Sequence, residues 1–75
     1  MATAYVLINA EMGEENRVHM RLKEIPEVKE AYMVYGVYDI IARVQTETME
    51  ELKDVLSWKI RRLDKVRSTL TMIVF

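Results

Sequence analysis

The segment from Tyr35 to Asp39 holds a glycine and an aspartate three residues apart, at the head of the apolar run Ile40–Val44. Gly36 permits a positive backbone angle in a tight turn, and Asp39 follows that turn directly. The Asp39 carboxylate can face a ligand ammonium group, while exposed backbone amides of the turn can receive a ligand carboxylate. This pattern therefore predicts a site for a small molecule between two strands.

The same residue types also admit a purely structural interpretation. Asp39 can bond the backbone amides of its own turn, as aspartates in turns commonly do. Thr69 and Thr71 alternate with Leu70 and Met72 near the end of the chain, where β-branched residues are ordinary strand formers. Their hydroxyls can instead line the pocket that Asp39 opens, and the sequence leaves both interpretations open.

Other chemistry finds little support among the reactive residue types. The chain has no cysteine and a single histidine, His19, whereas nucleophilic and metal sites usually need several such groups. His19 falls in the middle of an expected helix, about 100° from its apolar stripe, and is expected at the surface between Arg17 and Arg21. We therefore expect no catalytic residue, no metal ion and no cofactor.

Acidic residues and glycines near the N-terminus fit structural roles. Glu11, Glu14 and Glu15 stand close together, but acidic residues are typical of the first turn of a helix. Gly13 and Gly36 are the only glycines, so no glycine-rich loop can cradle a phosphate.

Size and composition limit the class of protein. With 75 residues, the chain is expected to form one domain, residues 1–75, which buries only about 60% of its unfolded surface. Yet 51% of its residues are hydrophobic and it has no cysteine for a disulfide, so oligomerisation is the expected support. The formal net charge of −1 lacks the basic surplus of a nucleic-acid-binding protein.

Location is bounded by the absence of targeting patterns. No apolar run approaches about 18 residues, so no transmembrane helix is expected. No basic region precedes an apolar stretch at the N-terminus, so no signal peptide is expected. The lack of cysteine fits a cytoplasmic protein. A local basic group is expected to be the end of a helix facing the dipole and solvent; its members are Lys59, Arg61, Arg62, Lys65 and Arg67.

Hydrophobic periodicity predicts four strands and two helices. Strands are expected at residues 3–11, 28–34, 38–45 and 66–75. The first helix carries the stripe Val18, Leu22 and Ile25 and ends at Pro26, which cannot continue it.

The second helix is expected to start at a capping box formed by Thr48 and Glu51. Its apolar face holds residues at helical spacing, namely Met49, Leu52, Leu56, Ile60 and Leu63. Trp58 lies nearly opposite this face. Because tryptophan is enriched at interfaces, Trp58 is expected at an oligomer contact, with partial cover by neighbouring loops as the alternative.

The order βαββαβ, with a hairpin turn at Tyr35-Gly36-Val37, predicts an α+β fold of the ferredoxin-like type. It is a four-stranded antiparallel sheet with two helices on one face. The first strand should lie between the third and fourth, which leaves the second and fourth as edges. Apolar residues alternate onto both faces of the strands, and two helices can cover only one face. The other face is expected to pack on the sheet of a second copy in a homodimer of the dimeric α+β barrel type.

Three stretches together resemble the effector-binding domain of the Lrp/AsnC family, also called the RAM domain. They are the opening Ala4–Asn9, the stretch Val34–Val44 and the ending Leu63–Val74, so the match spans essentially the whole chain. Gly-x-x-Asp alone is a weak motif. Combined with the ending Val-x-x-Thr-x-Thr and the element order, it is fairly specific.

The resemblance implies a domain that dimerises through its sheet, with dimers that assemble into larger rings. It implies an amino-acid effector bound at contacts between dimers, and thus an amino-acid sensor and oligomerisation module that modulates transcription through ligand-dependent assembly. The ligand-binding residues that the resemblance implies come from the hairpin and the last strand; they are Tyr35, Gly36, Val37, Tyr38, Asp39, Thr69, Thr71 and Met72.

Two features depart from the family pattern. Most relatives carry an N-terminal helix-turn-helix of comparable length to this chain, whereas here Met1 stands directly before the first expected strand. A stand-alone effector domain without its own DNA contact is therefore expected, acting by mixed assembly with full-length Lrp/AsnC regulators. The glycine usual in the turn before the last strand is replaced by Asp64-Lys65, which bears on the shape of that turn.

Two other functions fit the same expected fold. Small dimeric α+β barrel enzymes use this kind of sheet pairing, but they usually place a histidine or several polar residues inside the barrel, so no enzyme is expected. A purely structural oligomerisation domain is the other alternative, and it would hold Asp39 satisfied within the chain.

Overall fold

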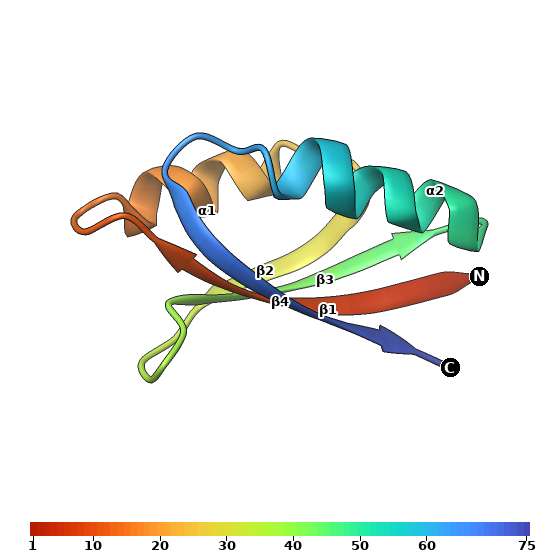
Figure 1. The fold of residues 1–75 in the computed structure, drawn as a ribbon, viewed down its shortest axis with the longest axis horizontal. Coiled ribbons are helices and arrows are strands. Elements are labelled where there is room, and N and C mark those ends of the chain that lie inside the picture. Colours follow the sequence, from red (N-terminus) through yellow and green to blue (C-terminus); the bar gives the residue numbers. More distant parts are fainter.

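A four-stranded antiparallel sheet carries two helical segments on one face in the computed structural model, which describes residues 1–75 (Figure 1). The strands lie in the order β2-β3-β1-β4, so β1 lies between β3 and β4 as expected. The predicted order βαββαβ is confirmed, because the π-helix η1 continues α2 without a break. The elements are β1 (Ala2–Ala10), α1 (Glu15–Lys23), β2 (Val28–Met33), β3 (Ile40–Thr46), α2 (Met49–Asp54), η1 (Val55–Ile60) and β4 (Val66–Val74).

Side chains of β1 alternate between the two faces of the sheet. Val6 and Ile8 are fully buried under the helices, whereas Tyr5 and Leu7 lie on the face without helices. The registers with β3 and β4 extend this alternation across the sheet. The open sheet face, as the uncovered side is called from here on, is rich in apolar residues; they are Tyr5, Leu7, Tyr32, Ile41, Leu70, Met72 and Val74.

Helix α1 begins two residues after Gly13, which adopts φ +82°. An acidic residue, Glu15, lies in its first turn, where the helix dipole favours negative charge. Val18 and Leu22 are fully buried against the sheet. The helix ends before Pro26, as predicted, because proline lacks the N–H that a further turn would need.

The second helical segment starts at the predicted cap. The Thr48 hydroxyl accepts a hydrogen bond from the Glu51 N–H at 3.1 Å. The segment is not one α-helix, however, because the Arg61 N–H donates to the Leu56 carbonyl, five residues back, at 3.1 Å. The buried residues Leu52, Leu56 and Ile60 stand four apart, a spacing that an α-helix also uses, so periodicity alone could not predict η1. Met49, which was expected on the apolar face, is exposed, and Val55 is buried in its place. Neither α1 nor the α2–η1 segment has the length and apolar character that a membrane crossing requires.

In the turn before β4, a residue other than glycine adopts a backbone conformation that favours glycine. Lys65 adopts φ +72° and is the only non-glycine residue with a positive φ. Its carbonyl accepts a hydrogen bond from the Glu11 N–H at 2.7 Å, which ties the turn to the end of β1. A side chain in this left-handed region costs roughly 1–2 kcal/mol, so the substitution noted in the sequence leaves strain in the turn.

Candidate functional site

Asp39 is anchored to the end of β1 by both its backbone and its side chain. Its N–H donates to the carbonyl of Ile8 at 2.9 Å, and its Oδ2 accepts from the N–H of Ala10 at 3.0 Å. The structural alternative expected Asp39 to bond the amides of its own turn. The carboxylate instead accepts from the N–H of Ala10 in β1, so that expectation is wrong. Oδ1 has no hydrogen-bond partner within the chain and stays available to a ligand.

The connection between β2 and β3 is longer than the predicted three-residue turn. It runs over residues 34–39, called here the 34–39 loop, and closes with the Val34 N–H donating to the Asp39 carbonyl at 2.8 Å. Its tip extends away from the sheet, at the end of the molecule opposite the two termini (Figure 1). The backbone amides of residues 35–38 donate no hydrogen bond within the chain, so they are free to receive an anion.

The tip of this loop exposes large apolar side chains to solvent. Tyr35 and Val37 are almost entirely exposed, and Tyr38 is half-buried. Between them Gly36 has φ +152°, and a Cβ built on it would meet nothing within 4 Å. The glycine is thus required by backbone conformation alone, and the loop presents two large side chains to another molecule.

A cavity of about 420 Å³ opens beside Asp39. Two of the residues expected to bind a ligand, Tyr35 and Asp39, line it together with Glu15, Met33 and Val34. Glu15, Met33 and Val34 were not predicted as site residues. Met33 directly precedes the loop, which was an available signal, whereas Glu15 comes from α1 and reaches the site only through the tertiary fold. The cavity combines two carboxylates with an apolar wall, which suits a ligand that carries an ammonium group and an apolar side chain.

The predicted residues of β4 do not join this cavity within one chain. Thr69 pairs with Ile8 and Thr71 with Val6, which places both on the helix-covered face. Met72 pairs with Tyr5 and lies on the open sheet face instead. Thr69 and Asp39 nevertheless flank the same residue of β1, because the Asp39 N–H bonds the Ile8 carbonyl. The eight predicted residues are thus split over the loop and both faces of the sheet.

His19 is not a free surface histidine, contrary to the sequence-based expectation. Its Nε2 lies 2.7 Å from the carbonyl oxygen of Ala31, and since a carbonyl can only accept, the ring nitrogen donates. Ala31 belongs to the edge strand β2, and His19 is half-buried. The hydrogen bond therefore joins α1 to the edge of the sheet. The neighbours of His19 in the sequence could not indicate this structural role, because Ala31 lies 12 positions away.

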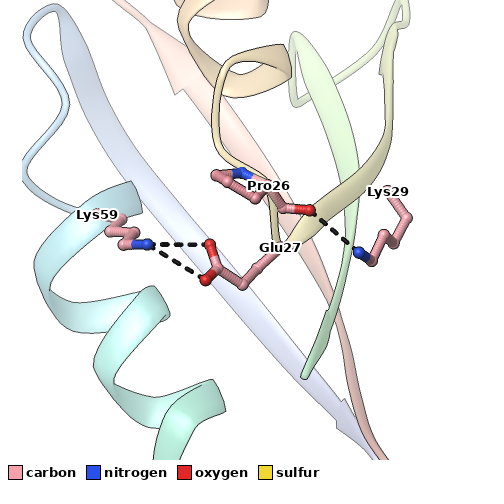
Figure 2. A network of polar contacts seen from close by, with 4 residues as sticks. All are labelled: Pro26, Glu27, Lys29 and Lys59. Atoms are coloured by element: carbon pink, nitrogen blue, oxygen red, sulfur yellow. Dashed lines mark hydrogen bonds and ion pairs between the residues drawn. The ribbon is translucent and has the colours of Figure 1, made fainter. Parts of the chain in front are cut away.

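Glu27 and Lys59 join the start of β2 to η1. Figure 2 shows the ammonium of Lys59 facing both carboxylate oxygens of Glu27, at 3.0 and 3.2 Å, while Lys29 reaches the carbonyl of Pro26 at 3.1 Å. The hydrogen bond from Lys59 is the main cause that lowers the pKa of Glu27 below its ordinary value of 4.5. This pair holds the helical layer against the sheet on the side away from Asp39.

A second ion pair lies on the open sheet face. Arg43 Nε contacts Glu30 Oε1 at 2.8 Å. This hydrogen bond is the main cause that lowers the pKa of Glu30 and raises that of Arg43, and the charge of Glu30 raises the pKa of the Tyr32 hydroxyl. The open sheet face is therefore apolar along β1 and β4, with a charged pair towards the β2 edge.

Comparison with known proteins places this fold and loop in a family. The family model of the Lrp/AsnC ligand binding domain matches residues 3–75. The chain belongs to this family, as its sequence predicted. The HTH-type transcriptional regulator FL11 of Pyrococcus furiosus is 34% identical over 71 residues, which are 95% of this chain and 46% of the regulator. The chain thus spans about half the length of the curated relatives it matches, and those relatives are transcription regulators rather than enzymes.

Solved structures agree on the fold. The crystal structure of FFRP-DM1 superposes with a TM-score of 0.96 at 43% identity and covers 100% of both chains. A transcriptional regulator from Neisseria meningitidis, solved as a complex with L-Met, has a TM-score of 0.83 at 13% identity and covers 99% of this chain and 49% of that one. The predicted ferredoxin-like architecture is confirmed by these neighbours.

Proposed function

We propose that this chain is an amino-acid-binding sensor and oligomerisation module that modulates transcription through ligand-dependent assembly. The observation that carries the proposal is the arrangement around Asp39. One carboxylate oxygen is held by Ala10, the other is free beside the cavity, and the amides of residues 35–38 are unpaired. A negative group and a row of N–H donors on one short loop match the two charged groups that every amino acid shares.

In the proposed binding mode, Asp39 Oδ1 accepts from the ligand ammonium group. The amides of residues 35–38 bind the ligand carboxylate, and Met33, Val34 and Tyr35 contact its side chain. Glu15 adds a second negative charge to the cavity, which favours the ammonium further. The Neisseria regulator of the same fold that binds L-Met gives this ligand class a precedent in another protein.

Thr69, Thr71 and Met72 enter the proposal through a second copy. They lie outside the cavity of their own chain, and the tip residues Tyr35 and Val37 are bare. A site completed between copies would bring the loop of one chain against β4 of another and would couple ligand binding to assembly.

Homodimerisation through the open sheet face is part of the same proposal. A sheet with helices on one side normally has a polar outer face, whereas here Leu70, Met72 and Val74 are each exposed by nearly half. A second copy packed on this face would remove those side chains from water. Because the matched regulators carry a further segment beyond this domain, we propose that the dimer also assembles with full-length family members.

A thermal-shift screen against the twenty amino acids tests the sensor. A ligand at 100 times its Kd stabilises the folded state by about 2.7 kcal/mol, which in a domain of this size moves the melting midpoint by roughly 10 °C or more. We expect a shift with one or a few amino acids. The matched variant Asp39→Asn keeps an oxygen for the Ala10 N–H but removes the charge, so it should fold and lose the shift.

The structural alternative has one observation in its favour, namely that Asp39 already has a partner in Ala10. If no amino acid shifts the midpoint of the wild-type protein, the chain is an oligomerisation domain and Asp39 is a fastening between strands. If Asp39→Asn retains the full shift, the ligand binds elsewhere and the binding mode proposed above is wrong.

A further inference from the structure

The outer face of the α2–η1 segment carries a partly exposed tryptophan among charged residues. Trp58 is 62% exposed. The guanidinium carbon of Arg62 lies 4.1 Å from the centre of its ring, which is cation–π distance. Glu51 and Asp54 also line a groove of about 220 Å³ beside Trp58, together with Val55 and the paired residues Glu27 and Lys59. Glu51, Asp54, Trp58 and Arg62 therefore share one face, called here the Trp58 stripe.

Charge reverses along this segment at Trp58. The exposed charged residues before it are acidic except for Lys53, and those after it as far as Arg62 are basic. The acidic set is Glu47, Glu50, Glu51 and Asp54, and the basic set is Lys59, Arg61 and Arg62. Asp54 stands four residues before Trp58, and Arg62 stands four residues after it. When two such segments lie antiparallel with their Trp58 residues opposite each other, Asp54 of each copy therefore faces Arg62 of the other.

We propose that two copies of this chain pack through their Trp58 stripes, antiparallel and about a two-fold axis at Trp58. In such an isologous contact each residue meets the one at the mirrored position. Asp54 then meets Arg62 of the second copy, and Arg62 meets its Asp54. The two tryptophans meet at the axis. Their indole rings bury apolar area there, which the charged residues at either end of the Trp58 stripe do not provide.

The groove beside Trp58 supports this occupant. Lys59 in its lining is already paired with Glu27, so the carboxylates of Glu51 and Asp54, the Trp58 ring and Val55 remain, which together suit a guanidinium group. Arg62 covers one side of the indole in its own chain, and the second copy supplies an arginine to the groove. A wholly basic peptide would be repelled by Lys59 and Arg62, and a nucleic acid by Glu51 and Asp54, so a second copy fits best.

This contact is separate from the proposed sheet dimer and goes beyond the proposed function. The helices cover one side of the sheet and the open sheet face is the other (Figure 1), so one chain can make both contacts at once. Two different two-fold contacts that alternate build an assembly larger than a dimer, which closes into a ring or continues as a filament. The Trp58 stripe would then set the size of the assembly.

Sedimentation velocity over a concentration series, in buffer without amino acids, tests the inference. The variants are Trp58→Ala, Asp54→Arg, Arg62→Asp and the double variant with both charge changes. Each single variant should weaken the contact at least ten-fold in dissociation constant, and the double variant should restore it, because the charges are exchanged rather than lost. Arg21→Glu, at an exposed basic position on α1, is the matched control and should leave the mass unchanged.

The measured species separate this contact from the sheet dimer. If both contacts form, the wild type is larger than a dimer and Trp58→Ala stops at the dimer. If only the stripe contact forms, the wild type is a dimer and Trp58→Ala is a monomer. A wild type whose mass is unaffected by the single variants, or a double variant no better than the singles with folding intact by circular dichroism, overturns the inference. Ligand binding plays no part in either result.

Discussion

The carboxylate of Asp39 accepts a hydrogen bond from the backbone N–H of Ala10 at 3.0 Å, although the two residues are 29 positions apart in the sequence. The bond fastens the 34–39 loop to the end of β1 and fixes one carboxylate oxygen while the other stays free. Asp39 is therefore both a proposed ligand contact and a structural tie, and substitutions there must separate the two roles.

Asp39→Ala should lower the free energy of unfolding by about 1–3 kcal/mol, because it leaves the Ala10 N–H without its acceptor. Asp39→Asn should cost less than about 1 kcal/mol, since an amide oxygen can take the same bond. Urea unfolding of both variants without ligand measures the difference. Equal stability of the alanine variant and the wild type would show that the Ala10 bond contributes nothing.

Gly36→Ala and Gly36→Val should destabilise the fold by similar amounts, of about 1–3 kcal/mol, because the positive φ is strained for any side chain. No steric difference is expected, since nothing lies within 4 Å of the added Cβ. Thermal unfolding of the two variants is the measurement. A much larger loss for valine than for alanine would mean that the loop packs against something other than solvent.

Lys65→Gly should raise stability, because it relieves the left-handed backbone of Lys65 at φ +72°. The strain relieved is about 1–2 kcal/mol, less the roughly 0.5–1 kcal/mol that glycine's greater unfolded-state freedom costs. A rise of a few degrees in the melting midpoint is expected. A lower midpoint would indicate that the lysine side chain stabilises the turn by more than its backbone strains it.

The Glu27–Lys59 pair should make stability depend on acid. Because the pKa of Glu27 is lowered in the folded state, its contribution is fully present above pH of about 4.5 and is lost as the pH falls through the lowered value. Lys59→Met should cost about 0.2–1 kcal/mol at neutral pH, as partly exposed pairs do, and almost nothing at pH of about 2. Urea unfolding at several pH values measures this. If Lys59→Met lowers the free energy of unfolding by the same amount at acidic and at neutral pH, the ion pair is not the cause of the loss.

His19→Leu should lower the free energy of unfolding by about 0.5–1.5 kcal/mol, since it keeps the bulk of the side chain but removes the donor to the Ala31 carbonyl. Hydrogen exchange in β2 should quicken at the same time, because α1 no longer holds that edge. Unchanged exchange in β2 would show that the packing of Val18 and Leu22, rather than His19, keeps α1 in place.

Much of the fold could be predicted from local patterns. The alternation of Tyr5, Val6, Leu7 and Ile8 on a two-fold period indicates a strand with two apolar faces. Pro26 and the Thr48 cap mark helix ends through single-residue chemistry, which needs no knowledge of distant contacts. The Gly-x-x-Asp motif and the Val-x-x-Thr-x-Thr ending indicated the family because they combine fixed spacing with the element order.

The partners of those residues were decided only by the tertiary structure. The side chains of Asp39 and His19 bond Ala10 and Ala31 because strand pairing and helix docking bring them within 3.0 Å of these distant backbone groups. The sequence alone determined the order of strands and helices and the family of the chain. It could not determine that Glu15 lies in the cavity beside Asp39, or that Thr69 and Thr71 share the helix-covered face with Val6 and Ile8, because register and helix docking arise from long-range pairing.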